Sequence, residues 1–380
     1  MIRALYAGLF ALLALGLTPS HAADPSPKSL WVYFGTYTGG KDGSKGIYRS
    51  NLDVATGKLS EPELVAEMTS PSFLVVSPDR KNLYAVGEEG KKTVVAFAIE
   101  PKTGKLKELN SQPSGGSGPC HITIDRTGKT VLVANYGSGS CASLPVLAEG
   151  KLGEPASIHQ HKGSSVDPRQ KTPHAHSINV DPGNKFAVCA DLGLDQLLVY
   201  KLDPATGKTT PNDPPFATVA PGSGPRHFAF HPTKPLAFVI NEMKCTLNSL
   251  KFDSAKGTFA IIDTANTLPR DVGKGDSTAE VVVHPNGKWV YGSNRGHNSI
   301  AAFECSDEGK LKLIGHKGDG IKTPRNFNVD PTGKWLLVAN QDGASVISFE
   351  IDQKTGALKD AVSTVALSKP VCIKFVTPVE

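Results

Sequence analysis

Short runs of apolar or alternating residues recur along the chain, and two kinds of turn-like string separate them. The first string, rich in Asp, Thr and Gly, occurs seven times. Its copies are DVATGKL (from 53), EPKTGKL (100), AEGKL (148), DPATGKT (203), DSAKGTF (253), SDEGKL (306) and DQKTGAL (352). These residue types supply the backbone freedom and local hydrogen bonds of hairpin turns, so each copy predicts a turn between antiparallel strands.

The second string occurs six times, at a nearly regular period along the chain. Its copies are SPDRKNLY (from 77), DRTGKTVL (125), DPGNKFAV (181), HPTKPLAF (231), HPNGKWVY (284) and DPTGKWLL (330). A short apolar strand such as HITI or HFAF precedes most copies, and another follows, so one repeat contains about four strands. Four short strands repeated at this period are typical of a β-propeller.

The two ends of the chain supply the missing part of the pattern. PVCIKFV (from 370) resembles a first strand without a successor, and LWVYFGTYT (from 30) resembles a second strand without a predecessor. We therefore predict an all-β, seven-bladed β-propeller with four-stranded antiparallel blades, closed by exchange between the N- and C-terminal strands. A β-sandwich or an open row of hairpins is the alternative, but a closed ring leaves fewer exposed sheet edges.

The first residues predict export. Arg3 precedes a mostly apolar run from Ala4 to Leu17, and a small-residue cleavage site follows at Ser20, His21 and Ala22. This run is shorter than the roughly 20 apolar residues that a membrane span requires. We expect a signal peptide over residues 1–22, a single propeller domain over residues 23–380, and a periplasmic or secreted protein with no membrane partner.

Charge and cysteine content exclude other classes of function. The formal net charge is only +5 and its charges are scattered, so no nucleic-acid partner is expected. The six cysteines are widely spaced without a C-x-x-C pair, which argues against a zinc or thioredoxin-like site. Export would permit disulfides, and spacing leaves open whether these thiols are free or paired.

The repeats also predict which residues surround the central channel. The innermost strand of a blade pairs antiparallel with the second, so the beginning of one lies beside the end of the other. A constant spacing along the chain indicates this register. It separates four residues at the beginnings of inner strands from four at the ends of second strands, in the pairs Pro119 and Asn135, Pro225 and Asn241, Thr278 and Asn294, and Pro324 and Asn340. The same spacing counted back from Asp191 leads to Ala175, which places His176 at the ring position of Arg226 and Arg325.

Two further sets of polar residues fall on the same mouth of the channel. The next position of the inner strands holds His121, His227, Glu280 and Asn326, and the residue after each strand-ending Asn is Tyr136, Glu242, Arg295 or Gln341. Several of these residues also have a structural interpretation. Asn135 and Asn340 are expected to be turn residues, His231 a structural residue of the opposite face, and His176, Arg226, Glu242 and Arg295 could be an ion-pair network that plugs the channel. His174 and His176 lack a third metal ligand, so no metal site is predicted.

At these positions the chain resembles a known family. PHAHS, GPRHFAFHP followed by Asn241 and Glu242, AEVVVHPNGKWVYGSNRGHNSIAAF and PRNFNVDPTGKWLLVANQ resemble the propeller-type 6-phosphogluconolactonases, from about Trp31 to the C-terminus. That family is similar in fold to the fungal 3-carboxymuconate lactonising enzymes. The resemblance implies opening or closing of a lactone without metal or organic cofactor, and it places His176, Arg226, Glu242 and Arg295 on matching motif positions.

Lactone hydrolysis requires a base that activates water, a cation that stabilises the oxyanion and an acid for the leaving alkoxide. His176 and Glu242 are the candidates for proton transfer. Arg226 and Arg295 would bind a substrate carboxylate or phosphate and stabilise the oxyanion, and His121, His227 and Arg325 would add substrate contacts. The chain lacks a G-x-S-x-G elbow, which favours direct attack by water.

We therefore expect a monomeric, cofactor-independent hydrolase whose partner is a small-molecule lactone. An exported enzyme would rarely meet a cytosolic sugar phosphate, so an unphosphorylated aldonolactone is as plausible a substrate as 6-phosphogluconolactone. Two alternatives remain: a lactonising cycloisomerase acting on an unsaturated dicarboxylate, and a non-catalytic propeller that binds a ligand or protein. The second alternative predicts that His176 and Glu242 are packed or salt-bridged, with no open cavity beside them.

Overall fold

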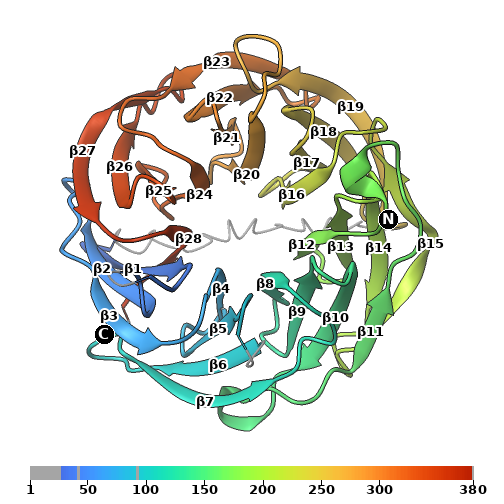
Figure 1. The fold of residues 1–380 in the computed structure, drawn as a ribbon, viewed down its shortest axis with the longest axis horizontal. Coiled ribbons are helices and arrows are strands. Elements are labelled where there is room, and N and C mark those ends of the chain that lie inside the picture. The colour runs from blue at the N-terminus through green and yellow to red at the C-terminus, as the bar shows by residue number, and fades with distance from the viewer. Residues whose placement is uncertain (1–26, 41–42, 91–93, 379–380) are drawn as a thin grey trace, which may run out of the picture.

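The computed structural model describes residues 27–40, 43–90 and 94–378, and the predicted signal peptide lies outside them. The described residues form seven four-stranded antiparallel sheets around a central channel, which confirms the predicted propeller (Figure 1). None of the helices in this part of the chain is long and apolar enough to cross a membrane.

The blades follow one another in chain order, and each is described from its inner to its outer strand. Blade 1 contains β28 (Pro370–Val376), β1 (Ser29–Thr36), β2 (Gly46–Asp53) and β3 (Glu63–Glu67). Blade 2 contains β4 (Phe73–Val76), β5 (Asn82–Val86), β6 (Val94–Ile99) and β7 (Leu106–Gln112). Blade 3 contains β8 (Pro119–Ile124), β9 (Thr130–Asn135), β10 (Ser140–Pro145) and β11 (Ser157–Gln160). Blade 4 contains β12 (Ala175–Val180), β13 (Phe186–Asp191), β14 (Gln196–Leu202) and β15 (Thr209–Thr218).

The remaining blades repeat this plan. Blade 5 contains β16 (Pro225–Phe230), β17 (Leu236–Asn241), β18 (Thr246–Asp253) and β19 (Thr258–Asn266). Blade 6 contains β20 (Ser277–Val283), β21 (Trp289–Arg295), β22 (Ser299–Cys305) and β23 (Leu311–Lys317). Blade 7 contains β24 (Pro324–Val329), β25 (Trp335–Asn340), β26 (Ser345–Ile351) and β27 (Leu358–Ala366). Two short 3₁₀ helices, η1 (Ala148–Gly150) and η2 (Pro168–Gln170), lie in the connections on either side of β11.

The terminal strands close the ring as predicted. The C-terminal β28 is the inner strand of blade 1 and pairs antiparallel with the N-terminal β1, with Phe34 opposite Ile373. The inner strands of neighbouring blades contact one another all the way round, from β28 through β4, β8, β12, β16 and β20 to β24 and back. Joining the two ends in one sheet leaves neither of them as a free edge at the channel.

Apolar contacts between adjacent sheets hold the ring together. The second strands are covered on both faces by their neighbours, so that every residue of the LAFVIN segment of β17 is buried. The predicted hairpin turns join third and fourth strands and also touch the preceding blade. Gly356, for example, has a φ of +76° and packs so closely on Trp289 that a Cβ would lie 2.5 Å from its ring. Its carbonyl oxygen accepts a 2.8 Å hydrogen bond from the Tyr291 hydroxyl.

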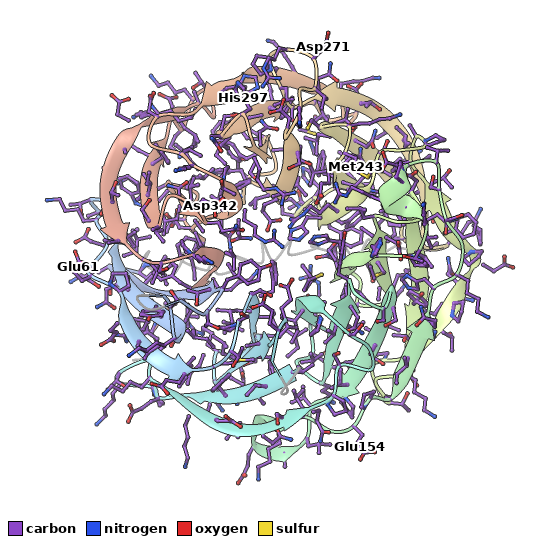
Figure 2. The ribbon with its side chains drawn as sticks, viewed as in Figure 1. Glu61, Glu154, Met243, Asp271, His297 and Asp342 are labelled. Atoms are coloured by element: carbon purple, nitrogen blue, oxygen red, sulfur yellow. The ribbon has the colours of Figure 1, made fainter. Side chains whose placement is uncertain are left out.

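The six cysteines, whose state the sequence left open, are buried free thiols in the structure. Side chains project into the central channel of the ring (Figure 2). Met243 and Asp342, in the connections that follow β17 and β25, lie nearer its axis than Glu61 and Asp271 at the rim (Figure 2).

Candidate active site

Inner strands of four blades begin with the same β-bulge. In blade 5, Pro225 pairs with Asn241 and His227 with Ile240, which leaves Arg226 outside the regular ladder. The residues at this bulged position are Cys120, His176, Arg226 and Arg325. The register expected from the constant spacing and the shift expected at PHAHS are therefore confirmed. A bulge interrupts the alternation of side chains between the two faces of a strand. The side chains of these four residues therefore take a different direction from the one that a regular strand would give them.

Glu242, the residue after β17, binds three guanidinium groups. Its Oε2 atom lies 2.9 Å from Nε of Arg226 and 3.0 Å from Nη2 of Arg295, and its Oε1 atom lies 2.6 Å from Nη2 of Arg169. These residues come from blades 5 and 6 and from η2, between blades 3 and 4. The propeller thus brings one carboxylate and three cations together at the mouth of the channel.

Backbone carbonyls orient two of these guanidinium groups further. Nη1 of Arg226 donates to the Ala279 oxygen at 2.7 Å, and Nη2 of Arg295 donates to the Thr278 oxygen at 2.7 Å. Burial lowers the pKa of Arg226 to about 10, so the side chain stays protonated at neutral pH. Both guanidinium groups are therefore fixed cations, and Arg295 keeps part of its side chain in contact with solvent.

The carboxyl group of Glu242 is ionised at neutral pH. Burial acts to raise its pKa, but the charges of Arg295, Arg226 and Arg169 outweigh burial and lower the pKa to about 2. A carboxylate with this pKa is a weak proton acceptor. Its ion pairs position the guanidinium groups, which is also the arrangement that the plugged-channel interpretation expects.

His176 lies beside this charge cluster in the beginning of β12. Its side chain is buried, with Nδ1 3.8 Å from Sγ of Cys120, and its ring centroid lies 5.3 Å from those of both Tyr136 and His227. Burial and the charge of Arg226 hold the pKa of His176 well below its usual value. The imidazole is therefore neutral in the unliganded protein.

A second polar cluster lies next to His176 and crosses the channel. Its residues, His121, His227, Glu280 and Asn326, come from the next position of the inner strands. Nδ1 of His227 lies 2.8 Å from Oε1 of Glu280, and the Glu280 carboxylate also accepts a hydrogen bond from Asn326. Burial raises the pKa of Glu280 to about 6. His121 packs against Phe73 with the rings tilted and their centroids 4.2 Å apart, and its Nδ1 accepts a hydrogen bond from the backbone of β12. Burial lowers the pKa of both His121 and His227 well below the usual value.

A cavity of about 280 Å³ opens on the other side of this cluster. It is lined by His121, Glu280 and Asn326 and by residues from the later parts of inner strands, including Asn328 and Lys374. The Glu242 cluster, in contrast, lies at the beginnings of these strands. The structure therefore brings His176, Arg226, Glu242 and Arg295 together at one mouth and places His121 on the side of the opposite mouth.

Known proteins with the same architecture place the chain in a family. Residues 31–375 match the family described as lactonase, 7-bladed beta-propeller. A 6-phosphogluconolactonase of Bacillus subtilis (strain 168) is 36% identical over 345 residues, which cover 90% of this chain and 97% of that protein. The solved structure of a periplasmic gluconolactonase of Pseudomonas aeruginosa is 27% identical with a TM-score of 0.87, covering 92% of this chain and 100% of that one.

The chain belongs to the seven-bladed β-propeller lactonase family. A further relative, a 6-phosphogluconolactonase of Formosa agariphila, is 34% identical over 309 residues, which cover 79% of this chain and 86% of that protein. Family membership therefore rests on nearly the whole propeller. The resemblance recognised in the sequence motifs is confirmed.

Arg325, the last of the residues predicted to contact the substrate, lies over an aromatic ring. Its Cζ atom lies 5.2 Å from the ring centroid of Tyr37, whose hydroxyl donates to Oε2 of Glu88 at 2.9 Å. Among the residues that the structure describes, no carboxylate forms an ion pair with Arg325. Its charge instead contributes to the low pKa of His176.

Sequence reasoning missed Arg169 in this lactonase-family site. The DPRQ segment that contains it forms the capped helix η2, in which the Asp167 side chain accepts from the Arg169 backbone and the Gln170 side chain accepts from the Asp167 backbone. An Asp followed three residues later by Gln is a recognisable capping box. That signal could have located the helix, but not the carboxylate that Arg169 reaches.

The structure confirms the structural interpretations of Asn135, Asn340 and His231. Nδ2 of Asn135 donates to the Ser114 oxygen at 3.0 Å, and Nδ2 of Asn340 donates to the Gly320 oxygen at 3.2 Å, so both secure loops. His231 accepts two backbone N–H groups in its turn and contacts the Gly287 oxygen. His174 stacks on Tyr136 and its Nδ1 lies 3.1 Å from the Tyr136 oxygen.

Proposed function

We propose that the chain is a cofactor-independent hydrolase that opens a sugar lactone at the channel mouth formed around Arg226. Membership of the lactonase family supports this reaction class. The observation that carries the proposal is the convergence of three guanidinium groups on Glu242, close to the neutral imidazole of His176. Cations stabilise the oxyanion of an opening lactone, and an imidazole can transfer the proton.

In the proposed reaction, water attacks the lactone carbonyl while a ring nitrogen of His176 accepts its proton. Negative charge develops on the carbonyl oxygen, where the guanidinium groups of Arg226 and Arg295 stabilise it. The C–O bond of the ring then breaks, and the protonated His176 returns the proton to the leaving alkoxide. The products are one hydroxyl group and one carboxylic acid, which releases its proton to solvent and becomes the carboxylate, so the imidazole ends in its starting state.

The low pKa of His176 is consistent with this role when the substrate is included. In the free site, burial and the positive charge of Arg226 disfavour the imidazolium ion. The negative charge that develops on the carbonyl oxygen would offset that positive charge and raise the proton affinity of His176 at the moment of reaction. Glu242 would remain ionised and position the guanidinium groups. It would not transfer the proton, which is the role that its residue type suggested.

The substrate class that we propose is an aldonolactone, phosphorylated or not. Arg169, with about half of its side chain exposed, and Arg295 offer positive charge at the mouth, which suits a phosphate or a carboxylate product. The names of the relatives support both forms, because one is a 6-phosphogluconolactonase and another a periplasmic gluconolactonase. The predicted export favours the unphosphorylated lactone.

Two other functions compete with hydrolysis. A non-catalytic ligand-binding propeller is favoured by one observation, the three ion pairs of Glu242 beside a buried His176. A lactonising cycloisomerase would use the same cations on an unsaturated dicarboxylate. Turnover of a muconate without lactone hydrolysis would select the cycloisomerase, and absence of both reactions would select the binding module.

The test is an assay of lactone opening above the spontaneous rate, with glucono-δ-lactone and its 6-phosphate compared at equal concentrations. We expect the wild-type chain to accelerate the opening of at least one of them. His176→Gln should abolish the acceleration while keeping the circular dichroism spectrum of the wild type. His316→Gln is the matched control, because that ring lies on the outer strand β23 of blade 6, where it contacts the Thr267 oxygen, and it should keep most of the activity. A fully active His176→Gln variant would refute the proposed base.

A further inference from the structure

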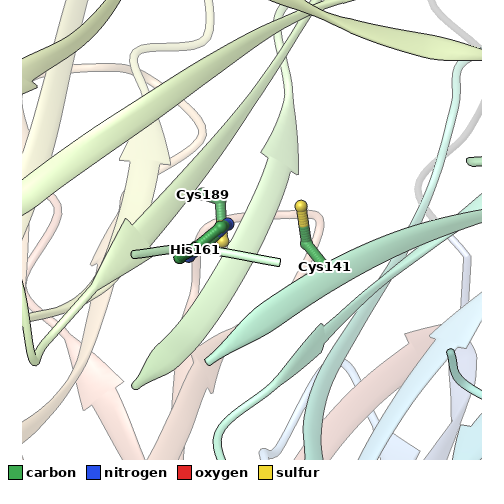
Figure 3. Close-up of side chains that lie close together, drawn as sticks. All are labelled: Cys141, His161 and Cys189. Carbon is green, nitrogen blue, oxygen red and sulfur yellow. The ribbon is translucent and has the colours of Figure 1, made fainter. Parts of the chain in front are cut away.

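Two cysteines and a histidine from blades 3 and 4 form a buried cluster apart from the lactonase site. Cys141 lies in β10, Cys189 in β13, and His161 directly follows β11. The two Sγ atoms and a ring nitrogen of His161 all lie within 4.8 Å of one another (Figure 3). Within the described ranges, this is the only group of three or more cysteine, histidine or acidic residues close enough to hold one ion.

The histidine of this cluster is held by a carboxylate. Nδ1 of His161 lies 2.6 Å from Oδ2 of Asp191, whose Oδ1 accepts the backbone N–H groups of His174 and Gly193 at 2.7 and 2.9 Å. The carboxylate is therefore fixed from two sides, and it orients the imidazole ring. Metal-binding histidines commonly donate their second ring nitrogen to a carboxylate in this way.

The other ring nitrogen of His161 faces a fourth polar group. Its Nε2 atom lies 3.0 Å from the hydroxyl of Tyr200, a residue of β14 in blade 4. Apolar residues enclose the group, including Leu132, Ala134 and Ala187. The cluster thus presents two sulfur atoms, one nitrogen and one oxygen in a buried space with apolar neighbours.

The residue types of the cluster are those of a ligand set for a soft cation. The thiolate is the form of cysteine that binds metal ions, and histidine binds them through a neutral ring nitrogen.

We propose that Cys141, His161 and Cys189 bind a thiophilic d¹⁰ cation, Zn²⁺ or Cu⁺, which joins blades 3 and 4. Soft thiolates with an imidazole suit these ions, whereas Mg²⁺ and Ca²⁺ prefer oxygen ligands. Binding releases to solvent the protons of the two thiols and any proton on Nε2 of His161, and it replaces the hydrogen bond between Tyr200 and Nε2 of His161. Tyr200 is left next to the cation, as a fourth ligand or as a donor to a thiolate.

Spacing rules could not have located this site. Cys141 and Cys189 are far apart in the sequence and His161 stands between them, so these three residues form no C-x-x-C or H-x₃₋₅-H pattern. The packing of one blade on the next brings the three side chains together. The proposed cation is structural, and it is independent of the lactonase reaction proposed above.

The experiment uses the full chain produced in medium supplemented with Zn²⁺, followed by elemental analysis. Because the cluster is buried, a second sample is unfolded with a chelator and a thiol reductant, and refolded with Co²⁺ or, without oxygen, with Cu⁺. We expect one cation per chain, a thiolate-to-cobalt charge-transfer band, and a higher thermal unfolding midpoint than for the metal-free chain. A wild-type chain that binds neither Zn²⁺ nor Cu⁺ overturns the proposal whatever the variants do.

Variants locate the site. Cys189→Ser and His161→Gln should lose the cation and the cobalt band, and Asp191→Asn should weaken binding by about 10- to 100-fold through loss of imidazole orientation. Cys305→Ser is the matched control, a buried thiol in blade 6, and it should bind as the wild type does. Unchanged binding in both ligand variants overturns the assignment. A Cys141–Cys189 disulfide, seen as an intact mass lower by two hydrogens, also overturns it.

Discussion

Nε of Arg226 lies 2.9 Å from Oε2 of Glu242, and this pair joins the beginning of one strand of blade 5 to the residue that follows the next strand. The guanidinium group is almost fully buried, and it reaches blade 6 through its hydrogen bond to the Ala279 oxygen. Burial of such an ion pair carries a desolvation penalty that can exceed the Coulombic gain, so its contribution to stability alone does not explain it. The pair therefore connects the architecture of the propeller to its proposed chemistry.

The Arg226→Lys variant should lose at least about 100-fold in kcat/KM for the lactone that the wild type opens. Lysine keeps the charge but cannot reproduce the guanidinium fork that contacts Glu242 and Ala279 together. Steady-state kinetics measure the loss, and circular dichroism checks the fold. Arg270→Lys, at a half-exposed arginine that pairs with Asp276, is the control and should behave as the wild type. Full activity in Arg226→Lys would contradict the oxyanion role.

The Arg169→Ala variant should raise KM by up to about fivefold and change kcat little. Half of the Arg169 side chain is exposed, and solvent screening limits an exposed ion pair to about 1 kcal/mol or less. The charge nonetheless lies at the mouth, where an anionic substrate would enter. The dependence of the initial rate on substrate concentration separates KM from kcat. A large fall in kcat with unchanged KM would show that Arg169 acts in the chemical step instead.

Glu242 should make the stability of the fold sensitive to acid. Its folded-state pKa of about 2 lies below the ordinary value of 4.5, so its contribution is present above pH 4.5 and is lost as the pH falls toward 2. A shift of this size corresponds to an upper limit of about 3 kcal/mol in the free energy of unfolding. Denaturant unfolding at several pH values between 3 and 7 measures it. Glu242→Gln should flatten this part of the profile, and an unchanged slope would contradict the assigned pKa.

Closure of the ring by β28 should dominate the stability of blade 1. Ile373 is completely buried and packs with Val32, Phe34 and Leu337, so Ile373→Ala should lower the free energy of unfolding by about 2 to 5 kcal/mol. Val362→Ala, on the outer strand of blade 7, removes a partly exposed side chain and should cost about 0.5 kcal/mol or less. Urea unfolding compares the two. Equal costs would mean that the terminal strand is not essential to the closed ring.

The repeats were sufficient to predict much of this protein. The turn strings located the hairpins because Gly and Asp residues are required where the backbone reverses, and the constant spacing to Asn241 and its equivalents indicated the strand register. The same register placed His176 at the ring position of Arg226 from the sequence alone. The split of blade 1 between β28 and β1 followed from the incomplete units at the two ends.

Only the tertiary structure decided which side chains meet across blades. Arg169 belongs to a loop between blades 3 and 4, yet it binds Glu242 of blade 5, and His161 meets Cys141 and Cys189 between two sheets. The structure also directed His121 toward the cavity opposite the Glu242 cluster. Local sequence patterns report turns and strand faces because these depend on neighbouring residues. Contacts between blades depend on the packing angle and closure of the whole ring, which no short segment encodes.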